Sequence, residues 1–178
     1  MRFVHLKQQV FGKQSGISVD ECIRAIGRAI RAGSEAWSWI DTVDNTLNVF
    51  KLHLIEYHEA MDKRTVAPKL RNTYLDLRNL LSILGEKVHD FARAFETVAK
   101  NCGFEARLVE SAIKELEFRA NDIETRLRKL LDEAYEAKAE GKLSSVEWAI
   151  DHDIPYSVRD KLSKLASIVE AVSRKIRI

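Results

Sequence analysis

One pair of residues in the chain has the spacing of a metal site. Glu86 and His89 stand three residues apart, which is the carboxylate–imidazole spacing that di-iron helical bundles use on two helices. The apolar positions around the pair turn it toward the outside of its helix, and the sequence has no second Glu-x-x-His. We therefore expect no metal site here.

A second acidic arrangement is similar to the magnesium site of all-helical nucleotide pyrophosphatases. Glu56 and Glu59 are followed by Glu86 on the next predicted helix. In a hairpin that turns near residue 65, Glu59 and Glu86 would lie roughly 20 Å apart along the axis, since a helix rises about 1.5 Å per residue. One cation cannot bridge that gap.

The remaining polar cluster is Asp151-His152-Asp153, directly before Ile154-Pro155. Acidic residues are common there as turn and cap formers, so we interpret the cluster as structural. The sequence has no glycine-rich phosphate loop and no Ser-His-Asp set. We expect no catalytic residues, no cofactor and no bound metal, and predict that the protein is not an enzyme.

Basic residues concentrate at the start of the chain instead. Residues 1–33 hold six basic and two acidic residues, a balance of +4, whereas the whole chain carries +2. Three arginines of the stretch CIRAIGRAIRAG fall within about 60° of one another on a helix, and like charges at i and i+4 repel unless an anion lies across them. This pattern favours sequence-independent binding of a nucleic-acid backbone. The predicted binding residues are Arg2, Lys7, Lys13, Arg24, Arg28 and Arg31.

The elements that must position these residues are helices. Four segments repeat apolar residues at alternating steps of three and four, and only seven glycines and two prolines interrupt the chain. We predict an all-α fold: an elongated up-down four-helix bundle over residues 34–178, preceded by a basic arm and amphipathic helix over residues 1–33. The predicted apolar seams run over residues 40–61, 70–102, 109–137 and 158–176.

Local signals set the expected helix ends. Ser18 and Glu21 form a capping box for the amphipathic helix, which should end near Gly33 and turn Val19, Cys22, Ile23, Ile26 and Ile30 inward. Gly103 and Gly141 should close the second and third segments. Ser144 and Glu147 form a capping box for a short helix near 145–152.

The two cysteines, Cys22 and Cys102, fall on apolar helix faces and are predicted to be buried thiols. Other apolar residues lie off the seams, which suggests contacts with other subunits. The predicted interface residues are Trp37, Trp39, Val49, Leu52 and Phe118.

This layout resembles the coat (nucleocapsid) proteins of filamentous archaeal viruses: a basic N-terminal arm and helix ahead of an elongated bundle, in a chain with only three glutamines and many lysines and glutamates, as in thermophiles. The resemblance implies a structural protein that wraps double-stranded DNA with its N-terminal segment and assembles with itself or a related subunit. We expect an intracellular or virion location without a membrane span. Two alternatives stay open: a helical adaptor that binds an acidic protein partner, and a basic stripe that is only a solvated face.

Overall fold

The computed structural model describes residues 18–103 and 106–176. Within these ranges the chain is helical except at the short connections at residues 60–62 and 138–142 and at residues 18 and 103, and it has no β-strand. The all-α prediction is therefore confirmed. Two segments of π-helix, η1 and η2, continue directly into the α-helices beside them, so the elements combine into four long helical rods. The elements are α2 (Val19–Glu59), α3 (Lys63–Cys102), α4 (Ala106–Asp122), η1 (Ile123–Leu127), α5 (Arg128–Ala137), α6 (Leu143–Trp148), η2 (Ala149–Asp153) and α7 (Ile154–Ile176).

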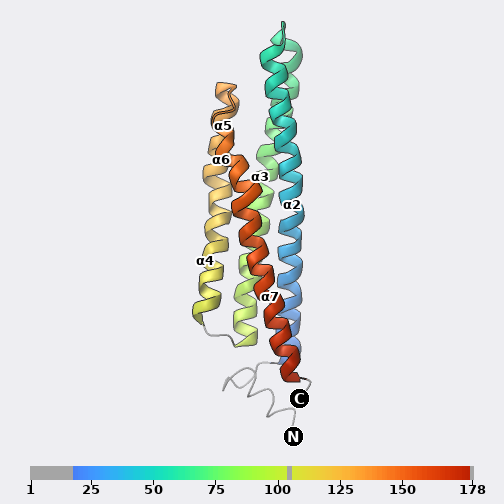
Figure 1. Ribbon diagram of the computed structural model, residues 1–178, viewed down its shortest axis with the longest axis vertical. Coiled ribbons are helices and arrows are strands. Elements are labelled where there is room, and N and C mark those ends of the chain that lie inside the picture. Colours follow the sequence, from blue (N-terminus) through green and yellow to red (C-terminus); the bar gives the residue numbers. More distant parts are fainter. Residues whose placement is uncertain (1–17, 104–105, 177–178) are drawn as a thin grey trace.

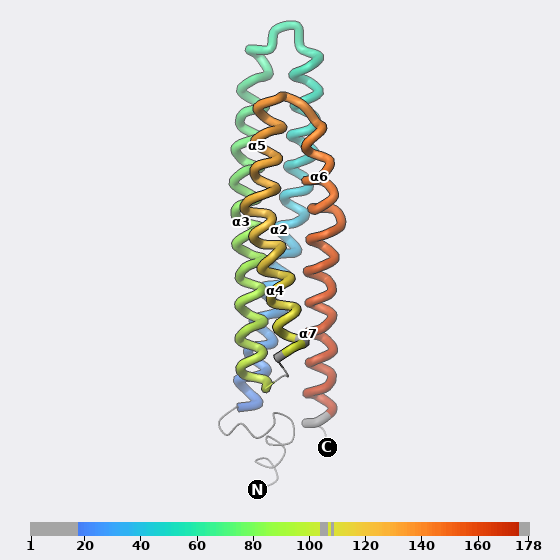
Figure 2. The backbone as a smooth tube through the Cα atoms, turned by 90° about the vertical axis from the view of Figure 1, so that its left-hand side faces the viewer, coloured from blue at the N-terminus to red at the C-terminus, as the bar shows by residue number. Residues whose placement is uncertain are grey.

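The four rods run alternately up and down (Figure 1). The α2–α3 hairpin extends beyond the α5–α6 connection (Figures 1 and 2), and α7 packs against both α2 and α4. One end of the bundle holds the start of α2, the end of α3, the start of α4 and the end of α7 (Figure 2).

The seam of α2 begins earlier than the sequence indicated. The helix that we expected to stop near Gly33 continues without a break to Glu59. A Cβ at Gly33 would lie 2.6 Å from Leu162 Cδ2 and 2.8 Å from the Phe91 ring, so glycine here permits close helix contact. The predicted boundary at residue 33 therefore falls inside a helix. The buried seam alternates steps of four and three through Cys22, Ile26, Ala29, Gly33, Ala36, Ile40, Val43, Leu47, Phe50 and Leu54.

The inward face of the first turns was predicted only in part. Cys22 and Ile26 are buried and Val19 is half-buried, but Ile23 and Ile30 are 50% and 38% exposed. These two isoleucines line an open groove together with Val169 and Val172 of α7.

The predicted seams of the four rods are largely buried, with three exceptions. Met61 follows the end of α2 and is fully exposed, while Ala137 and Val169 also face solvent. A helix that ends or diverges from its neighbours leaves its last seam positions without a partner. These three assignments to the core were wrong.

Helix ends follow the predicted signals only partly. Gly103 closes α3 in the left-handed conformation, with φ 66°, as predicted. The third rod ends earlier than expected, because Lys138, with φ 51°, takes the left-handed position in place of Gly141. Ser18 is the N-cap of α2, but its side chain makes no capping hydrogen bond.

The second predicted capping box is also absent. The N-cap of α6 is Lys142, and Ser144 lies inside the helix. The Ser144 hydroxyl donates to the carbonyl of Gly141, so the box with Glu147 does not form.

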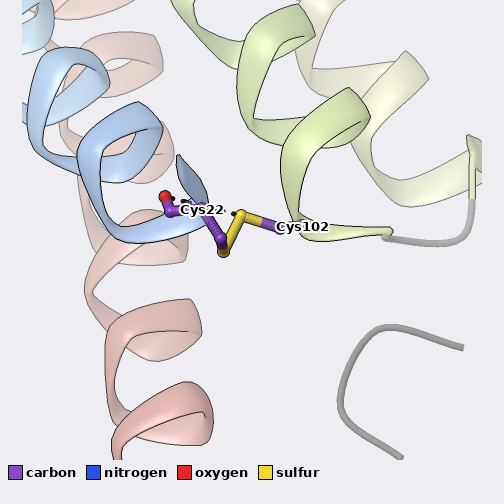
Figure 3. The surroundings of a disulfide bond; sticks show 2 residues. All are labelled: Cys22 and Cys102. Atoms are coloured by element: carbon purple, nitrogen blue, oxygen red, sulfur yellow. Dashed lines mark hydrogen bonds between the residues drawn. A yellow bond between two sulfur atoms is a disulfide. The ribbon is translucent and has the colours of Figure 1, made fainter. Parts of the chain in front are cut away.

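The two cysteines form a disulfide (Figure 3), which corrects the prediction of two thiols. Cys22 lies in the first turn of α2 and Cys102 in the last turn of α3, with their Cα atoms 4.9 Å apart. Antiparallel pairing of the two long helices brings together residues that are 80 positions apart in the sequence. The bond fixes the start of α2 to the end of α3.

Candidate nucleic-acid interface

Three arginines lie along the outward face of the first turns of α2. Arg24, Arg28 and Arg31 are all exposed, and at 100° per residue they lie opposite the buried seam that passes through Cys22 and Ala29. Within the described residues, none of the three has a carboxylate oxygen within 4 Å. The row spans about 10 Å along the helix axis. It is a line of three positive charges on one helix, and none of them forms an ion pair with the residues that the structure describes.

The acidic residues nearest to this row make other interactions. Asp20 and Glu21 lie in the first turn of α2, where negative charge is favourable beside the unpaired N–H groups of the helix. Glu35 lies one turn beyond Arg31, but its carboxylate pairs with Lys87 of α3 at 3.4 Å. The row is thus bounded by acids without being paired to them.

The fold adds basic residues that sequence reasoning missed. Lys100 at the end of α3 and Arg107 at the start of α4 are exposed and make no ion pair within the described residues. Arg174 near the end of α7 is exposed and pairs with Glu170 at 3.5 Å. Because antiparallel helices bring distant segments to one end, these residues join the arginines there, which is why we call it the basic end. Their gathering depends on the antiparallel alignment of the helices, which no local sequence pattern shows.

The predicted binding residues Arg2, Lys7 and Lys13 lie outside the described residues. They precede α2, whose first residue is at the basic end.

The small residues beside the arginines, Ala25, Gly27 and Ala32, differ in their exposure. Ala25 is buried in the core, and Ala32 is half-buried and packs against the core. Gly27 is exposed, and a Cβ there would meet nothing within 4 Å. An apolar groove of about 270 Å³ runs beside it, lined by Ile23, Ile26, Gly27, Ile30, Val169, Val172 and Ser173.

The predicted subunit-interface residues divide into two groups. Trp37 and Trp39 are half-buried and pack against the core of the same chain, and the Arg159 guanidinium lies 5.1 Å from the Trp37 ring. By contrast, Val49, Leu52 and Phe118 are 43%, 59% and 61% exposed. The last three therefore offer free apolar surface, while the tryptophans offer only their outer edges.

Two further aromatic residues, which the sequence analysis did not predict to be exposed, lie on the surface. Trp148 and Tyr156 are 60% and 71% exposed, although the Trp148 ring contacts His152 with ring centroids 4.1 Å apart and planes tilted by 41°. Their positions in a short helix and at the start of α7 lie outside any long periodic pattern.

The residues first considered for catalysis are not brought together. Glu86 is exposed, and His89 is half-buried with a buried Nδ1 that makes no hydrogen bond. In the ranges 18–103 and 106–176, no group of three or more His, Cys, Asp or Glu side chains could hold a metal ion.

The cluster Asp151-His152-Asp153 lies in the π-helical turn η2, not in the turn that we predicted. Asp153 faces Arg119 of α4 at 3.9 Å, while Asp151 hydrogen-bonds with Asp44 of α2. Burial and this hydrogen bond raise the pKa of Asp44 above its ordinary value. The cluster thus joins two neighbouring helices to η2.

Comparison of the chain with profiles of known protein families, with curated proteins and with solved structures gave no match. Across the described part of the chain, every helix is too short or too polar to cross a lipid bilayer.

Proposed function

We propose that this chain is a non-enzymatic structural protein that binds the phosphate backbone of double-stranded DNA at its basic end and assembles with further copies, as the coat protein of a filamentous virus does. The observation that carries the proposal is the row of Arg24, Arg28 and Arg31, exposed on one helix face and lacking carboxylate partners within 4 Å among the described residues. Arginine is well suited to phosphate, since its planar guanidinium donates several hydrogen bonds at once.

The arrangement supports binding without sequence readout. A helix that reads bases inserts polar side chains into the major groove, and its N-terminal residues contact the base edges. Around the arginine row, the outward positions of α2 hold Gly27, Ser34 and the acids Asp20 and Glu35, and no glutamine or asparagine lies between residues 18 and 44. Phosphate contacts position a protein on a duplex and carry no sequence information.

The long bundle supports the assembly part of the proposal. Leu52 and Phe118 lie on different helices and are each about 60% exposed. Exposed apolar residues that gather on a surface mark interaction sites. A bundle whose basic end binds DNA leaves its long sides free for contacts with neighbouring copies.

The test is binding of the full chain to labelled 30-base-pair duplexes of unrelated sequence, measured by fluorescence anisotropy. We expect equal affinity for all sequences and at least about tenfold weaker binding when Arg24, Arg28 and Arg31 are changed to Gln, since each lost phosphate contact removes favourable counterion release. Changing Lys69, Arg71 and Lys129 to Gln is the matched control. These three residues are also exposed and cationic but lie away from the basic end, and their loss should change affinity far less.

Two outcomes would redirect the proposal. If the protein binds duplex RNA more tightly than duplex DNA at the same salt concentration, the proposed ligand becomes RNA in place of DNA. Absence of duplex binding at low salt, together with binding to an acidic polypeptide such as polyglutamate, would replace the coat-protein proposal with the adaptor.

A further inference from the structure

An apolar hollow lies between Ile23–Ile30 of α2 and Val169–Ser173 of α7, and we call it the α2–α7 groove. Its volume is about 270 Å³, and among the described residues no charged side chain lines it. Ile23, Ile30 and Val169 are 50%, 38% and 37% exposed there. An apolar occupant is favoured, because covering these side chains removes apolar surface from water.

The groove lies directly beside the arginine row, with Gly27 between them. At 100° per residue, Ile23 and Ile30 lie roughly 40–60° to one side of Gly27 around α2, and Arg24 and Arg31 lie roughly 40–60° to the other side. Gly27 is exposed and has no side chain that would separate the two surfaces. A segment bound in the groove is therefore also next to the arginines.

Residues 1–17 have the composition that the groove favours. They lie outside the described residues and directly precede Ser18, the N-cap of α2. Five of the nine residues 3–11 are large and apolar, and residues 1–17 contain no acidic residue. The apolar residues are Phe3, Val4, Leu6, Val10 and Phe11.

The segment is long enough to run along the groove. Phe11 precedes Ser18 by seven residues, which span about 23 Å when extended. Ile30 follows Ser18 by twelve residues, about 18 Å along the helix. Ser15 and Gly16 lie between Phe11 and α2, and these residue types are common in the tight turns that reverse a chain. Phe11 can thus reach every part of the groove.

Other occupants fit less well. Residues 104–105 and 177–178 are also outside the described ranges, but two residues span at most about 7 Å, whereas the groove follows α2 from Ile23 to Ile30 for about 10 Å. Residues 1–17 of a second copy carry the same side chains. However, the chain's own segment is attached beside the groove, at an effective concentration on the order of millimolar.

From these relationships we infer that residues 3–11 fold back along α2 and bind in the α2–α7 groove of their own chain through their large apolar side chains. The contact places Lys7 and Lys13 beside the arginine row, since both lysines lie within two residues of a groove-binding side chain. Apolar contacts then hold like charges side by side, and a phosphate group across them relieves the repulsion. This consequence for the lysines rests on the proposed function and extends its binding surface, whereas the docking itself does not require DNA.

The experiment introduces a photoreactive side chain into the full chain. Phe3 or Phe11 is replaced in turn by benzoylphenylalanine, whose ketone inserts into a neighbouring C–H bond under near-ultraviolet light. Mass spectrometry of the peptides identifies the bonded residue. A mixture of ¹⁵N-labelled and unlabelled copies distinguishes crosslinks within a chain from crosslinks between chains, because only the latter join peptides of unlike label.

Two double variants complete the design. The groove variant is Ile23→Ser with Ile30→Ser. The matched control is Ile55→Ser with Leu75→Ser, two apolar residues that are 45% and 47% exposed and lie outside the groove. Circular dichroism checks that both variants keep the helical fold.

We expect crosslinks within one chain, to residues 23–30 of α2 or 169–173 of α7. Their yield should fall at least about fivefold in the groove variant, because serine removes the apolar surface that holds the segment, and should not change in the control. The groove variant should also bind the 30-base-pair duplex at least about threefold more weakly, since Lys7 and Lys13 are no longer held beside the arginine row.

Three crosslinking results would overturn the docking: bonds to residues outside the groove, bonds only between chains, or an equal yield in the groove variant. An unchanged duplex affinity of the groove variant would overturn the placement of the two lysines. If the unchanged protein binds no duplex while the groove crosslinks remain, the docking holds and the proposed function fails.

Discussion

Cys22 and Cys102 are joined by a disulfide that connects the first turn of α2, directly before the exposed Arg24, to the last turn of α3. The bond closes a loop of 80 residues that contains the whole α2–α3 hairpin. It therefore holds in place the helix end from which the arginine row projects.

Reduction of this bond should lower the free energy of unfolding by about 4.5 kcal/mol, the chain-entropy value for a loop of this length. Cys102→Ser should have a similar effect. Urea denaturation with and without dithiothreitol measures both, and thiol titration of the native, unreduced protein is the control. Two reactive thiols after unfolding without reductant would show that the bond is absent.

Two glycines of α2 should respond to alanine in opposite ways. Gly27→Ala should stabilise the protein by about 0.5–1 kcal/mol, because a Cβ there meets nothing within 4 Å and alanine is the better helix former. Gly33→Ala should destabilise it by about 1–2 kcal/mol net, since the new Cβ would lie 2.9 Å or less from atoms of the buried Phe91 ring. Thermal unfolding of the two variants measures the difference, and a Gly33→Ala protein as stable as Gly27→Ala would contradict the close packing.

A buried lysine joins α4 to α7. The Lys161 side chain is 2% exposed and pairs with Glu115 and Asp160, and Ser157 donates to the other oxygen of Glu115 at 2.9 Å. Burial alone would raise the pKa of Glu115, but the hydrogen bonds from Lys161 and Ser157 hold it below its ordinary value. Since this pKa is depressed, the stabilisation is present above the ordinary glutamate range and is lost as the pH falls through the lower value.

Lys161→Ala should therefore cost about 3 kcal/mol, the low end for a broken buried pair, because Glu115 is 35% exposed. Replacing both partners, as Glu115→Leu with Lys161→Met, should restore most of the stability. Denaturant unfolding measures both variants beside Lys164→Ala, a lysine of the same helix that is 48% exposed. An equal loss for Lys161→Ala and Lys164→Ala would refute the assigned role.

The hydroxyl group of Tyr74 should lose its proton at a higher pH than an ordinary tyrosine does. Its hydroxyl donates to Asp132 at 2.5 Å, and burial, together with this bond, raises the pKa of Tyr74 to about 12. The folded pKa lies above the unfolded one, so this stabilisation is complete below about pH 10 and is lost as the pH rises toward 12. Absorbance at 295 nm should show a late phase that Tyr74→Phe removes. If that variant left the titration curve unchanged, Tyr74 would not be the group responsible.

The apolar seams of the four long helices could be predicted because buried leucines, valines and phenylalanines repeat at steps of three and four. The first part of the α2 seam could not be predicted, because Ala29, Gly33 and Ala36 continue the same repeat with small side chains, which resemble an interruption of the helix. A glycine can end a helix or can allow a neighbouring ring to pack closely, and the residue type alone does not show which role it has. For Gly33, the contact with Phe91 shows that glycine allows close packing.

The candidate site was predictable to a similar extent. The common face of Arg24, Arg28 and Arg31 follows from helical spacing, and all three are exposed. The disulfide, the burial of Lys161 and the gathering of Lys100 and Arg107 at the same end all depend on how the antiparallel helices align. That alignment is a tertiary property which no local pattern carries.

The central claim is that the arginine row contacts phosphates, and the salt dependence of duplex binding tests it most directly. Each phosphate contact adds about −0.9 to the slope of log affinity against log salt concentration. We predict a slope of about −4 to −5 for the full chain, and a slope shallower by about 2.7 when Arg24, Arg28 and Arg31 are changed to Gln, with the Lys69, Arg71 and Lys129 control keeping the original slope. Equal slopes for the unchanged protein and the arginine variant would contradict the account, because the row would then be only a solvated helix face.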